Sequence, residues 1–565
     1  MKGSIASIDA ASWHVAALEF GIELDDDGLR AVARIGRIEL PSVDIVLNDT
    51  TVVCREILLA VGRADCADAM ISAEFPVSGR QTVAGSFSYE QQSETVRFRL
   101  QELSLAGGKL SFSGYADRSG FEVQFESGEL QLADLIQAAS QFTPGAGELK
   151  AAGNTGVKGS IESGPGGAFK VSLAADLSEA AVSNDAGTIV TDALFGKLEM
   201  TMRQSPDGYH FDLDFAADRG EVYVEPVYAN LGEHALAIHL HDASTADFLN
   251  FSLPDLLVEQ DSLLRIGGAL KIALAQNDHP VTVNGRVELT DSSVDALYGS
   301  GLQIVAAGTA FGDLETAGRI SGSIELENNL PVAAKFTFND VFIDDKQRRF
   351  AVYGLNGELY WPGRGKTADD VPATRLAWGS ASAFGIILDG TEVTLQLGAD
   401  DVELVSPLRI ATMGGALRIN RLAIHDYGSD EASGLLDAAL EPIQLGQLTG
   451  AFGWPAFSGT LSGQLPLLQY DGHAMTVGGD LTASAFGGEI TMSGLRLEQP
   501  FGRVPRLRGD LTLRDIELER LTDTFSFGLI QGRLSGDVTD LEMLAWRPVA
   551  MDLHLYTPEG DRSRH

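Results

Sequence analysis

The sequence has few cysteines, few prolines and no long hydrophobic run, and each of these absences excludes a class of protein. Two cysteines among 565 residues cannot build a disulfide-rich scaffold. The 19 prolines are too few for collagen or for Pro-rich linkers. Apolar stretches such as Leu263 to Leu274 are interrupted well before the ~18 to 20 residues that a membrane-spanning helix requires. We therefore expect a folded chain without a helical membrane span.

Positive charge is also scarce. The 41 Lys and Arg residues face 79 Asp and Glu residues, which gives a formal net charge of −38. Such a surface repels phosphate backbones, so we expect no nucleic-acid partner. Hydrophobic residues nevertheless make up 44% of the chain and charged residues only 21%, a balance that excludes wholesale disorder.

Alternation of apolar and polar residues is the dominant pattern that the sequence does have. Val96, Phe98 and Leu100 alternate with polar neighbours, and Leu110 and Phe112 repeat the pattern. Runs of this kind recur every ten to fifteen residues, with Gly, Asn or Asp between them. No long amphipathic helix competes with them. The pattern predicts an all-β fold of antiparallel strands.

A second regularity joins the end of a strand to a short helical turn. The apolar residues of three copies are Leu130, Leu132, Leu135 and Ala139; Ile443, Leu445, Leu448 and Phe452; and Ile516, Leu518, Leu521 and Phe525. The steps between them are two, three and four residues, of which the first is typical of a strand and the others of a helix. A looser relative covers Ala243 to Phe251, where Asp242 is a possible cap.

A long sheet with one apolar face must bury that face against something. The sequence holds too little helix to cover it, so we expect the sheet to curl on itself. Roughly 35 to 40 strands of about 7 residues each would build an elongated, taco-like antiparallel β-groove or a solenoid, with short helical turns between multi-strand repeats. The width of such a groove would accommodate acyl chains.

The C-terminal region carries motifs that resemble a known family. They are FSGTLSGQLP (457–466), FGGEI (486–490), PFGRVP (500–505), TFSFGLIQGRLSGDV (524–538) and a final run over 541–564. Together they resemble the YdbH-type, AsmA-like family of envelope proteins. We accordingly expect a repeated β-strand groove region over residues 1–435 and a YdbH-like β region over residues 436–565.

This resemblance implies a function and a location. Family members are repeating β-groove proteins that are anchored in the inner membrane of Gram-negative bacteria, cross the periplasm and conduct phospholipid toward the outer membrane. A small outer-membrane lipoprotein is implied as a partner that adds strands at the C-terminal edge. Relative to the family, this chain lacks the N-terminal anchor and a segment beyond His565, so we expect it to be a fragment or a mis-started reading frame.

We therefore predict a non-enzymatic lipid conduit without a cofactor. The residues expected to line its groove are Val96, Phe98, Leu100, Leu110, Phe112, Phe211, Leu213, Phe215, Phe336, Phe338, Leu511, Leu513, Phe525 and Phe527. The same periodicity is equally consistent with a packed core, because an acyl chain and a leucine side chain provide the same environment. The alternative is a surface or adhesin-like β-solenoid with a dry core. No serine-hydrolase motif of the form G-x-S-x-G is present.

Three polar features allow more than one interpretation. Cys54 and Cys66 are either a disulfide or two buried thiols. His239 and His241, with Asp242, lack further ligands nearby, so we interpret them as a solvated edge strand and expect no metal. Acidic residues at 344 and 345 precede a basic cluster at 346–349 and are predicted to form a turn in water.

Overall fold

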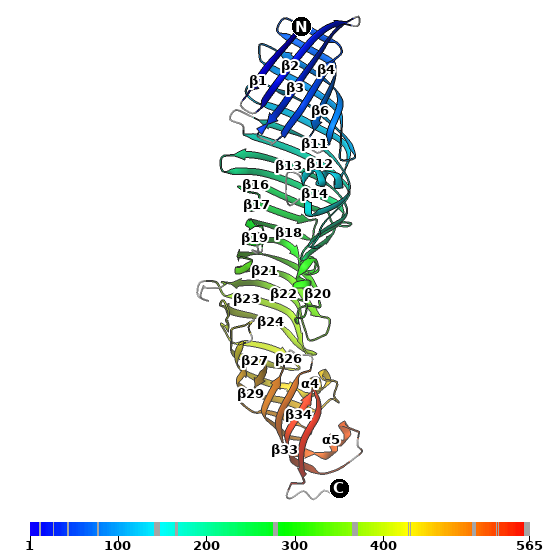
Figure 1. Cartoon of the computed structure of the whole chain (residues 1–565). Helices are drawn as coiled ribbons and strands as arrows, with labels where there is room; N and C mark the ends of the chain where they lie inside the picture. The colour runs from blue at the N-terminus through cyan, green and yellow to red at the C-terminus, as the bar shows by residue number, and fades with distance from the viewer. Residues whose placement is uncertain are drawn as a thin grey trace. The chain divides into compact units, whose positions relative to one another are not determined.

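The computed structural model describes residues 1–10, 13–25, 28–41, 45–75, 78–163 without 141–146, 168–274, 281–363, 371–427, 429, 431–499, 504–526, 528 and 530–558. Its 35 strand segments all belong to one sheet, and the neighbouring pairs are antiparallel (Figure 1). The prediction of an all-β antiparallel fold is therefore confirmed. Contacts divide the chain into two compact units, Met1–Val287 and Glu288–His565. The boundary expected at 435/436 rests on the family-like motifs and stays a prediction.

Unit 1 is almost entirely strand. It contains β1 (Lys2–Asp9), β2 (His14–Asp25), β3 (Gly28–Leu40), β4 (Ile45–Cys54), β5 (Ile57–Ala60), β6 (Arg63–Phe75), β7 (Gly79–Glu90), β8 (Thr95–Leu105), β9 (Gly108–Ala116), β10 (Phe121–Gln131), helix α1 (Leu132–Ala139), β11 (Leu149–Ser163), β12 (Phe169–Asn184), β13 (Ile189–Ser205), β14 (Gly208–Val224), β15 (Val227–Asn230), β16 (Leu236–Thr245), β17 (Asn250–Gln260) and β18 (Leu264–Ala273). The unit boundary lies within β19 (Thr282–Ser293).

Unit 2 contains more helical segments. It continues with α2 (Val294–Leu297), the π-helix η3 (Tyr298–Leu302), α3 (Gln303–Val305), β20 (Leu314–Glu327), β21 (Leu330–Asp345), β22 (Phe350–Trp361), β23 (Thr374–Ala383), β24 (Ile386–Leu397), β25 (Val402–Leu404), β26 (Leu408–Thr412), β27 (Gly415–His425), β28 (Ser433–Gln444), α4 (Leu445–Ala451), β29 (Gly459–Tyr470), β30 (Ala474–Thr476), β31 (Leu481–Ala485), β32 (Gly488–Glu498), β33 (Arg506–Glu517), α5 (Leu518–Thr524), β34 (Arg533–Leu544) and β35 (Arg547–Tyr556). Among the described residues, no helix is long and apolar enough to cross a membrane.

Four strands are interrupted. The two segments of each pair, β4 with β5, β15 with β16, β25 with β26, and β30 with β31, lie beside the same neighbouring strand. The strands are also longer than expected, up to 17 residues in β13 and β14. The expected strand length was wrong because β-bulges, such as the one between Leu177 and Ala180, shift the alternation inside a continuous strand.

The three predicted strand-to-helix transitions are confirmed. Helices α1, α4 and α5 begin at Leu132, Leu445 and Leu518, each directly after a strand. The looser fourth copy contains no helix: residues 246–249 form a bend, in which the Phe248 amide donates to the hydroxyl of Thr245 at 2.8 Å, so Thr245 takes the capping place expected for Asp242. A transition that the sequence pattern missed lies after β19, where α2 begins at Val294. The same spacing is present there, but its first and last positions are Ser292 and Gly301 instead of apolar residues.

A tight turn recurs beside each of the three predicted helices. The central residues are Ala106 and Gly107, Met413 and Gly414, and Phe486 and Gly487, and all six have positive φ. These are two-residue hairpins of type I′, which favour glycine at the second position. In each copy the first turn residue accepts a backbone hydrogen bond of 2.8 or 2.9 Å from the residue before the helix. The turn therefore fixes the place where the chain leaves the sheet to form the helix.

The sheet of unit 1 curls. The indole Nε1 of Trp13, between β1 and β2, donates to the carbonyl of Asp117, between β9 and β10, at 2.9 Å. In a flat sheet these two connections would be seven strand spacings apart, roughly 34 Å at ~4.8 Å each. Their direct contact requires the intervening strands to bend round toward each other.

Large parts of both faces of the sheet stay open to solvent. The chain exposes 31130 Å² at a mass of 60.1 kDa, whereas a compact monomer of this mass exposes roughly 19,000 Å². Three separate small clusters of buried residues are centred on Ile443, Leu231 and Cys66, and other buried side chains, such as Leu130 and Val341, lie outside them. A second layer, which would bury one whole face in an ordinary β-sandwich, is not present among the described residues.

Cys54 and Cys66 form a disulfide, which is one of the two alternatives left open by the sequence. It connects the end of β4 to β6 next to the interruption between β4 and β5, and both residues are buried with Ile57 and Ala69.

We expect replacement of both cysteines by alanine to lower the free energy of unfolding by about 3 kcal/mol, because the crosslink closes a loop of about a dozen residues. Urea denaturation monitored by circular dichroism tests this. Equal stability of the wild type with and without reductant would contradict it.

Candidate functional site

Apolar residues of unit 1 form continuous rows across the strands. Each row consists of residues that lie directly opposite one another in neighbouring strands, so all of its side chains are on one face. Stripe A is Leu100, Phe112, Phe125, Gly159, Leu173, Met200, Leu213, Leu240 and Leu256. Stripe B is Phe98, Gly114, Val123, Ile161, Val171, Met202, Phe211 and Ala243. Stripe C is Val157, Ala175, Leu198, Phe215, Ile238, Val258 and Ile266.

Unit 2 contains equivalent rows. Stripe D is Leu417, Leu440, Gly463, Leu481, Met492, Leu511, Val538 and Leu553. Stripe E is Ile443, Leu461, Ala483, Ile490, Leu513, Gly536 and Leu555. Stripe F is Ile320, Phe338, Gly357, Leu376 and Val393. Stripes D and E reach β35, where Leu553 and Leu555 are 55% and 43% exposed.

Two glycines, Gly159 of stripe A and Gly322 of β20, lie under aromatic rings of the next strand. Phe125 is directly opposite Gly159, and a Cβ at Gly159 would come within 2.6 Å of the Phe125 Cζ atom. Gly322 and Phe336 show the same relation, with 2.6 Å to the Phe336 Cδ1 atom. The rings therefore lie across the neighbouring backbone instead of standing away from the sheet.

Most of the residues predicted to line the groove are on this apolar face and are neither fully buried nor fully exposed. Leu110 is an exception at 6% exposed, and Val96 is exposed at 38%. Phe525 is not on a strand: it follows α5, and its ring packs against Phe457 with centroids 5.6 Å apart. Phe527 lies outside the described residues. The structure thus brings Phe98, Leu100, Phe112, Phe211, Leu213 and Phe215 into stripes A to C of unit 1. Phe338, Leu511 and Leu513 belong to stripes F, D and E of unit 2, and Phe336 lies opposite Gly322 and Leu359.

Short helices cover part of the apolar face. Leu448 of α4 and Leu521 of α5 pack against the buried cluster that includes Ile443, Leu461 and Ile516, and Leu513 packs there as well. In unit 1, Leu132 of α1 packs against a cluster that also contacts Phe215. Each helix therefore buries some of the stripe residues near its own connection.

Aromatic rings gather around α4 and α5. The members of this aromatic cluster are Phe452, Trp454, Phe457, Phe486, Phe525 and Trp546, with neighbouring centroids 4.7 to 6.3 Å apart. They come from the segment after α4, the β31–β32 turn, the end of α5 and the β34–β35 turn. The sequence pattern missed Trp454 and Trp546, because they lie in connections and follow no strand or helix period.

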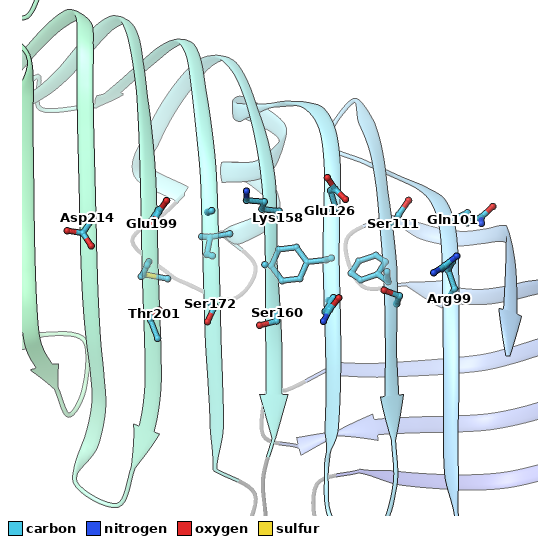
Figure 2. Close-up of a pocket in the computed structure, with 18 of the residues that line it drawn as sticks. Arg99, Gln101, Ser111, Glu126, Lys158, Ser160, Ser172, Glu199, Thr201 and Asp214 are labelled. Carbon is cyan, nitrogen blue, oxygen red and sulfur yellow. The ribbon is translucent and has the colours of Figure 1, made fainter. Parts of the chain in front are cut away.

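The opposite face of unit 1 is polar, and a hollow of about 1030 Å³ lies across β8 to β14 (Figure 2). Its polar lining includes Arg99, Gln101, Ser111, Glu126, Lys158, Ser160, Ser172, Glu199, Thr201 and Asp214. Phe112, Phe125, Gly159, Leu173 and Met200 of stripe A also belong to the lining, whereas Leu100 and Leu213 do not. The hollow is therefore lined mainly by the polar residues that alternate with stripe A, and in part by stripe A itself.

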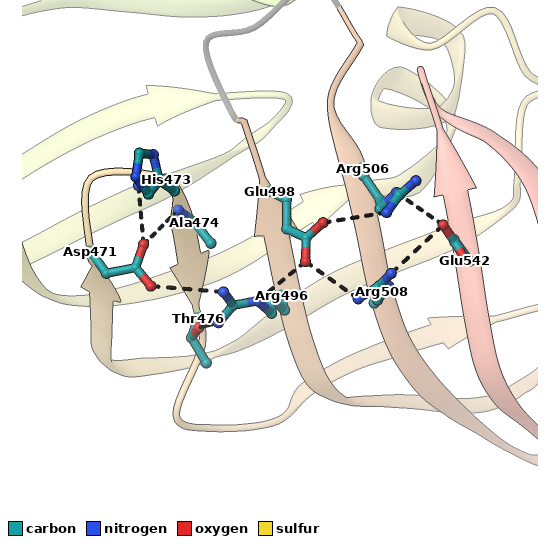
Figure 3. Close-up of polar contacts among 9 residues, drawn as sticks. All are labelled: Asp471, His473, Ala474, Thr476, Arg496, Glu498, Arg506, Arg508 and Glu542. Atoms are coloured by element: carbon teal, nitrogen blue, oxygen red, sulfur yellow. Dashed lines mark hydrogen bonds and ion pairs between the residues drawn. The ribbon is translucent and has the colours of Figure 1, made fainter. Parts of the chain in front are cut away.

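On the polar side of unit 2, ion pairs connect β32, β33 and β34 with the β29–β30 turn (Figure 3). Arg506 lies 2.9 Å from Glu542 and 3.8 Å from Glu498, and Arg508 lies 3.3 Å from Glu498. The Ala474 and His473 amides donate to Asp471 and hold the pKa of that carboxyl below its usual range. All of the arginines drawn are paired with carboxylates, so this network holds strand register and does not offer an anion site.

Comparison of the chain with protein-family models, with curated proteins and with solved structures finds no match. The structure itself shows a large all-β protein with one long antiparallel sheet and repeated strand-to-helix transitions.

Proposed function

We propose that this protein is a conduit that carries phospholipid acyl chains along the apolar face of its sheet. The observation that carries the proposal is the set of apolar stripes, which run from strand to strand. Most of their side chains stay half-buried, whereas Ile443, Leu461 and Ala483 of stripe E are buried. A row of similar side chains offers an acyl chain nearly equal binding at every strand. Movement between neighbouring positions then meets only low barriers, and no catalytic residue is needed.

The family resemblance supports the same proposal and supplies a location. The motif FGGEI includes the β31–β32 turn, and FSGTLSG and QGRLSGDV include the starts of β29 and β34. We propose membership of the YdbH-type, AsmA-like family and a place in the periplasm between the inner and outer membranes.

β35, the last of the described strands, supports the proposed partner. It pairs with β34, and all ten of its residues are exposed. Because stripes D and E end on this strand, an added strand from a small outer-membrane lipoprotein would continue the apolar face beyond it. An exposed edge of this kind otherwise favours aggregation.

The competing function is that of a surface scaffold with a dry interior. The buried clusters around α4 and α5 are the observation that favours it, because they show that part of the apolar face is packed by protein. The half-buried residues of stripe F, which belong to no described cluster, favour the conduit.

The two functions are separated by photo-crosslinking at adjacent residues of β21. A photoreactive amino acid replaces either Phe338, on the apolar face, or Thr337, which is exposed on the opposite face. The protein is expressed in a host with a Gram-negative envelope and irradiated there. We expect phospholipid adducts at position 338 and none at 337, measured by mass spectrometry.

The Thr337 substitution is the matched control, since Thr337 is the neighbour of Phe338 on the same strand but points to the opposite face. Absence of adducts at both positions in a folded protein would contradict the conduit and favour the dry scaffold. Equal adducts at both positions would also contradict it, because lipid would then contact the sheet without regard to face.

A further inference from the structure

The polar face of unit 1 brings together two histidines and an aspartate. His239 and His241 lie on β16, and Asp214 lies on β14. One ligand atom from each residue is within 4.8 Å of the other two, and this is the one such group of three found among the described residues. We propose that these residues bind a divalent transition metal ion, with zinc as the ion that their chemistry fits best.

The strand geometry explains why these side chains meet. Residues two apart on a strand point to the same face, which puts both imidazoles on the polar side. Asp214 is directly opposite His239 in the pairing of β14 with β16. The histidine rings lie nearly parallel, with centroids 6.4 Å apart. The third ligand is 25 residues away in sequence, so no local spacing could indicate it.

A β-bulge next to the site adjusts the position of His241. Two residues of β16, His241 and Asp242, oppose the single residue Asp212 of β14. Asp242 has a φ of 51°, and its amide donates to the Asp212 carboxylate at 3.0 Å. Bulges of this kind redirect side chains and are common beside functional sites. The interpretation of this segment as an edge strand was wrong, because β16 pairs with β14 on one side and β17 on the other.

The distances suit a metal after small side-chain rotations. The Nδ1 atom of His239 is 2.6 Å from the Asp214 Oδ1 atom, a hydrogen-bond distance. Tetrahedral zinc with bonds of ~2.0 to 2.1 Å holds its ligand atoms about 3.4 Å apart. The His239–Asp214 pair is closer than this at 2.6 Å, and all three ligand atoms lie within 4.8 Å of one another.

Charge and ligand type favour zinc over calcium or magnesium. The neighbouring carboxylates are Asp212, 3.9 Å from the His241 Nδ1 atom, Glu199 opposite Asp214, and Asp255 opposite His241. The guanidinium of Arg203 approaches Asp212 at 3.7 Å. Acidic surroundings attract any cation, but two imidazoles select transition metals over the oxygen-seeking ions. Three protein ligands leave one position for water or an anion.

Titration of the tag-free full chain with ZnCl₂ in a calorimeter, and with CoCl₂ in a visible spectrometer, tests the proposal. We expect one equivalent of metal and an intense tetrahedral cobalt spectrum. His239→Gln, His241→Gln and Asp214→Asn should each weaken binding by at least about 100-fold. Asp212→Asn, which removes a nearby carboxylate 3.9 Å from the His241 Nδ1 atom, should weaken it about 10-fold.

His425→Gln is the matched control. His425 also lies beside an aspartate, with 2.8 Å between its Nδ1 atom and the Asp401 Oδ1 atom, but it belongs to no described group of three ligands. Its replacement should leave metal affinity unchanged. Absence of a stoichiometric site, or an equal loss in the His425 variant, would overturn the proposal in favour of adventitious binding by surface histidines. Circular dichroism of each variant separates loss of ligand from loss of fold.

Discussion

Phe338→Glu is expected to reduce phospholipid transfer by about 100-fold while the protein remains folded. Phe338 is half-buried in stripe F between Ile320 and Gly357, on the face proposed to hold acyl chains. A carboxylate in hydrocarbon surroundings costs about 3 kcal/mol, and each 1.36 kcal/mol of added barrier slows a step about tenfold. The measurement is the rate of fluorescent phospholipid transfer between donor and acceptor vesicles with the purified full chain.

Thr337→Glu is the control for this prediction. It adds the same charge one residue away, but on the exposed polar face, where a carboxylate is solvated. Transfer by this variant should equal that of the wild type. If the Phe338 variant keeps its circular dichroism spectrum and also transfers lipid at the wild-type rate, the apolar face is not the path.

Local packing makes Phe338 a better position than Leu513 for a charged substitution. Leu513 is in stripe E and is an equally apolar target, but it packs against the buried cluster beneath α4 and α5. A charge at Leu513 would combine a block with a loss of stability, because an unpaired charge would enter a packed core. Phe338 is not part of any of the three described clusters, so a loss of transfer there is easier to interpret.

The sequence predicts the local structure well because strand and helix periods are local. Ile443, Leu445 and Leu448 specify a strand that becomes a helix through their spacing alone, and the structure has that transition. After β19 the same transition was missed, because Ser292 takes the place of the first apolar residue. A search for this apolar spacing therefore detects only those strand-to-helix transitions that have an apolar residue at every position of the spacing.

The pairing register of neighbouring strands could not be predicted from the sequence, because a register shift of one residue moves every side chain of a strand to the other face of the sheet. That Phe112 lies between Leu100 and Phe125 depends on the bulge between Leu100 and Leu103, which alternation does not show. For the same reason, the approach of Asp214 to His239 is visible only once β14 and β16 are paired.

The burial of one charged residue, Asp345, is a further feature that the sequence did not predict. The acidic residues before the basic cluster at 346–349 were predicted to form a turn in water, and residues 346 and 347 do form a turn. The prediction was wrong for Asp345, which is fully buried at 0% exposed. Its carboxylate accepts from the Arg349 guanidinium at 2.7 and 2.8 Å and from the Arg349 amide at 2.9 Å.

Asp345→Asn is expected to destabilise unit 2 by about 3 kcal/mol at neutral pH, because it leaves a largely buried guanidinium without its counter-charge. Arg349 is only 23% exposed, and it also donates to the Ala310 carbonyl at 3.0 Å, so the pair connects the β21–β22 turn to the segment before β20. Urea denaturation, together with hydrogen exchange of the amides around β21 and β22, measures the loss. The pair of Arg409 with Glu441 is the control: its carboxylate is 28% exposed instead of 0% and its arginine 55%, so Glu441→Gln should change stability far less.

The same ion pair predicts how stability depends on pH. The Arg349 guanidinium, through its hydrogen bonds, lowers the pKa of Asp345 from 3.8 to about 2. Because the folded-state pKa lies below the unfolded value, the stabilisation is complete above about pH 4 and is lost as the pH falls toward 2. The shift corresponds to about 2 kcal/mol at neutral pH. The difference in unfolding free energy between the wild type and Asp345→Asn should therefore shrink by about this amount over that interval. A difference that stays constant down to pH 2 would show that the asparagine acts through packing, and not through the lost charge.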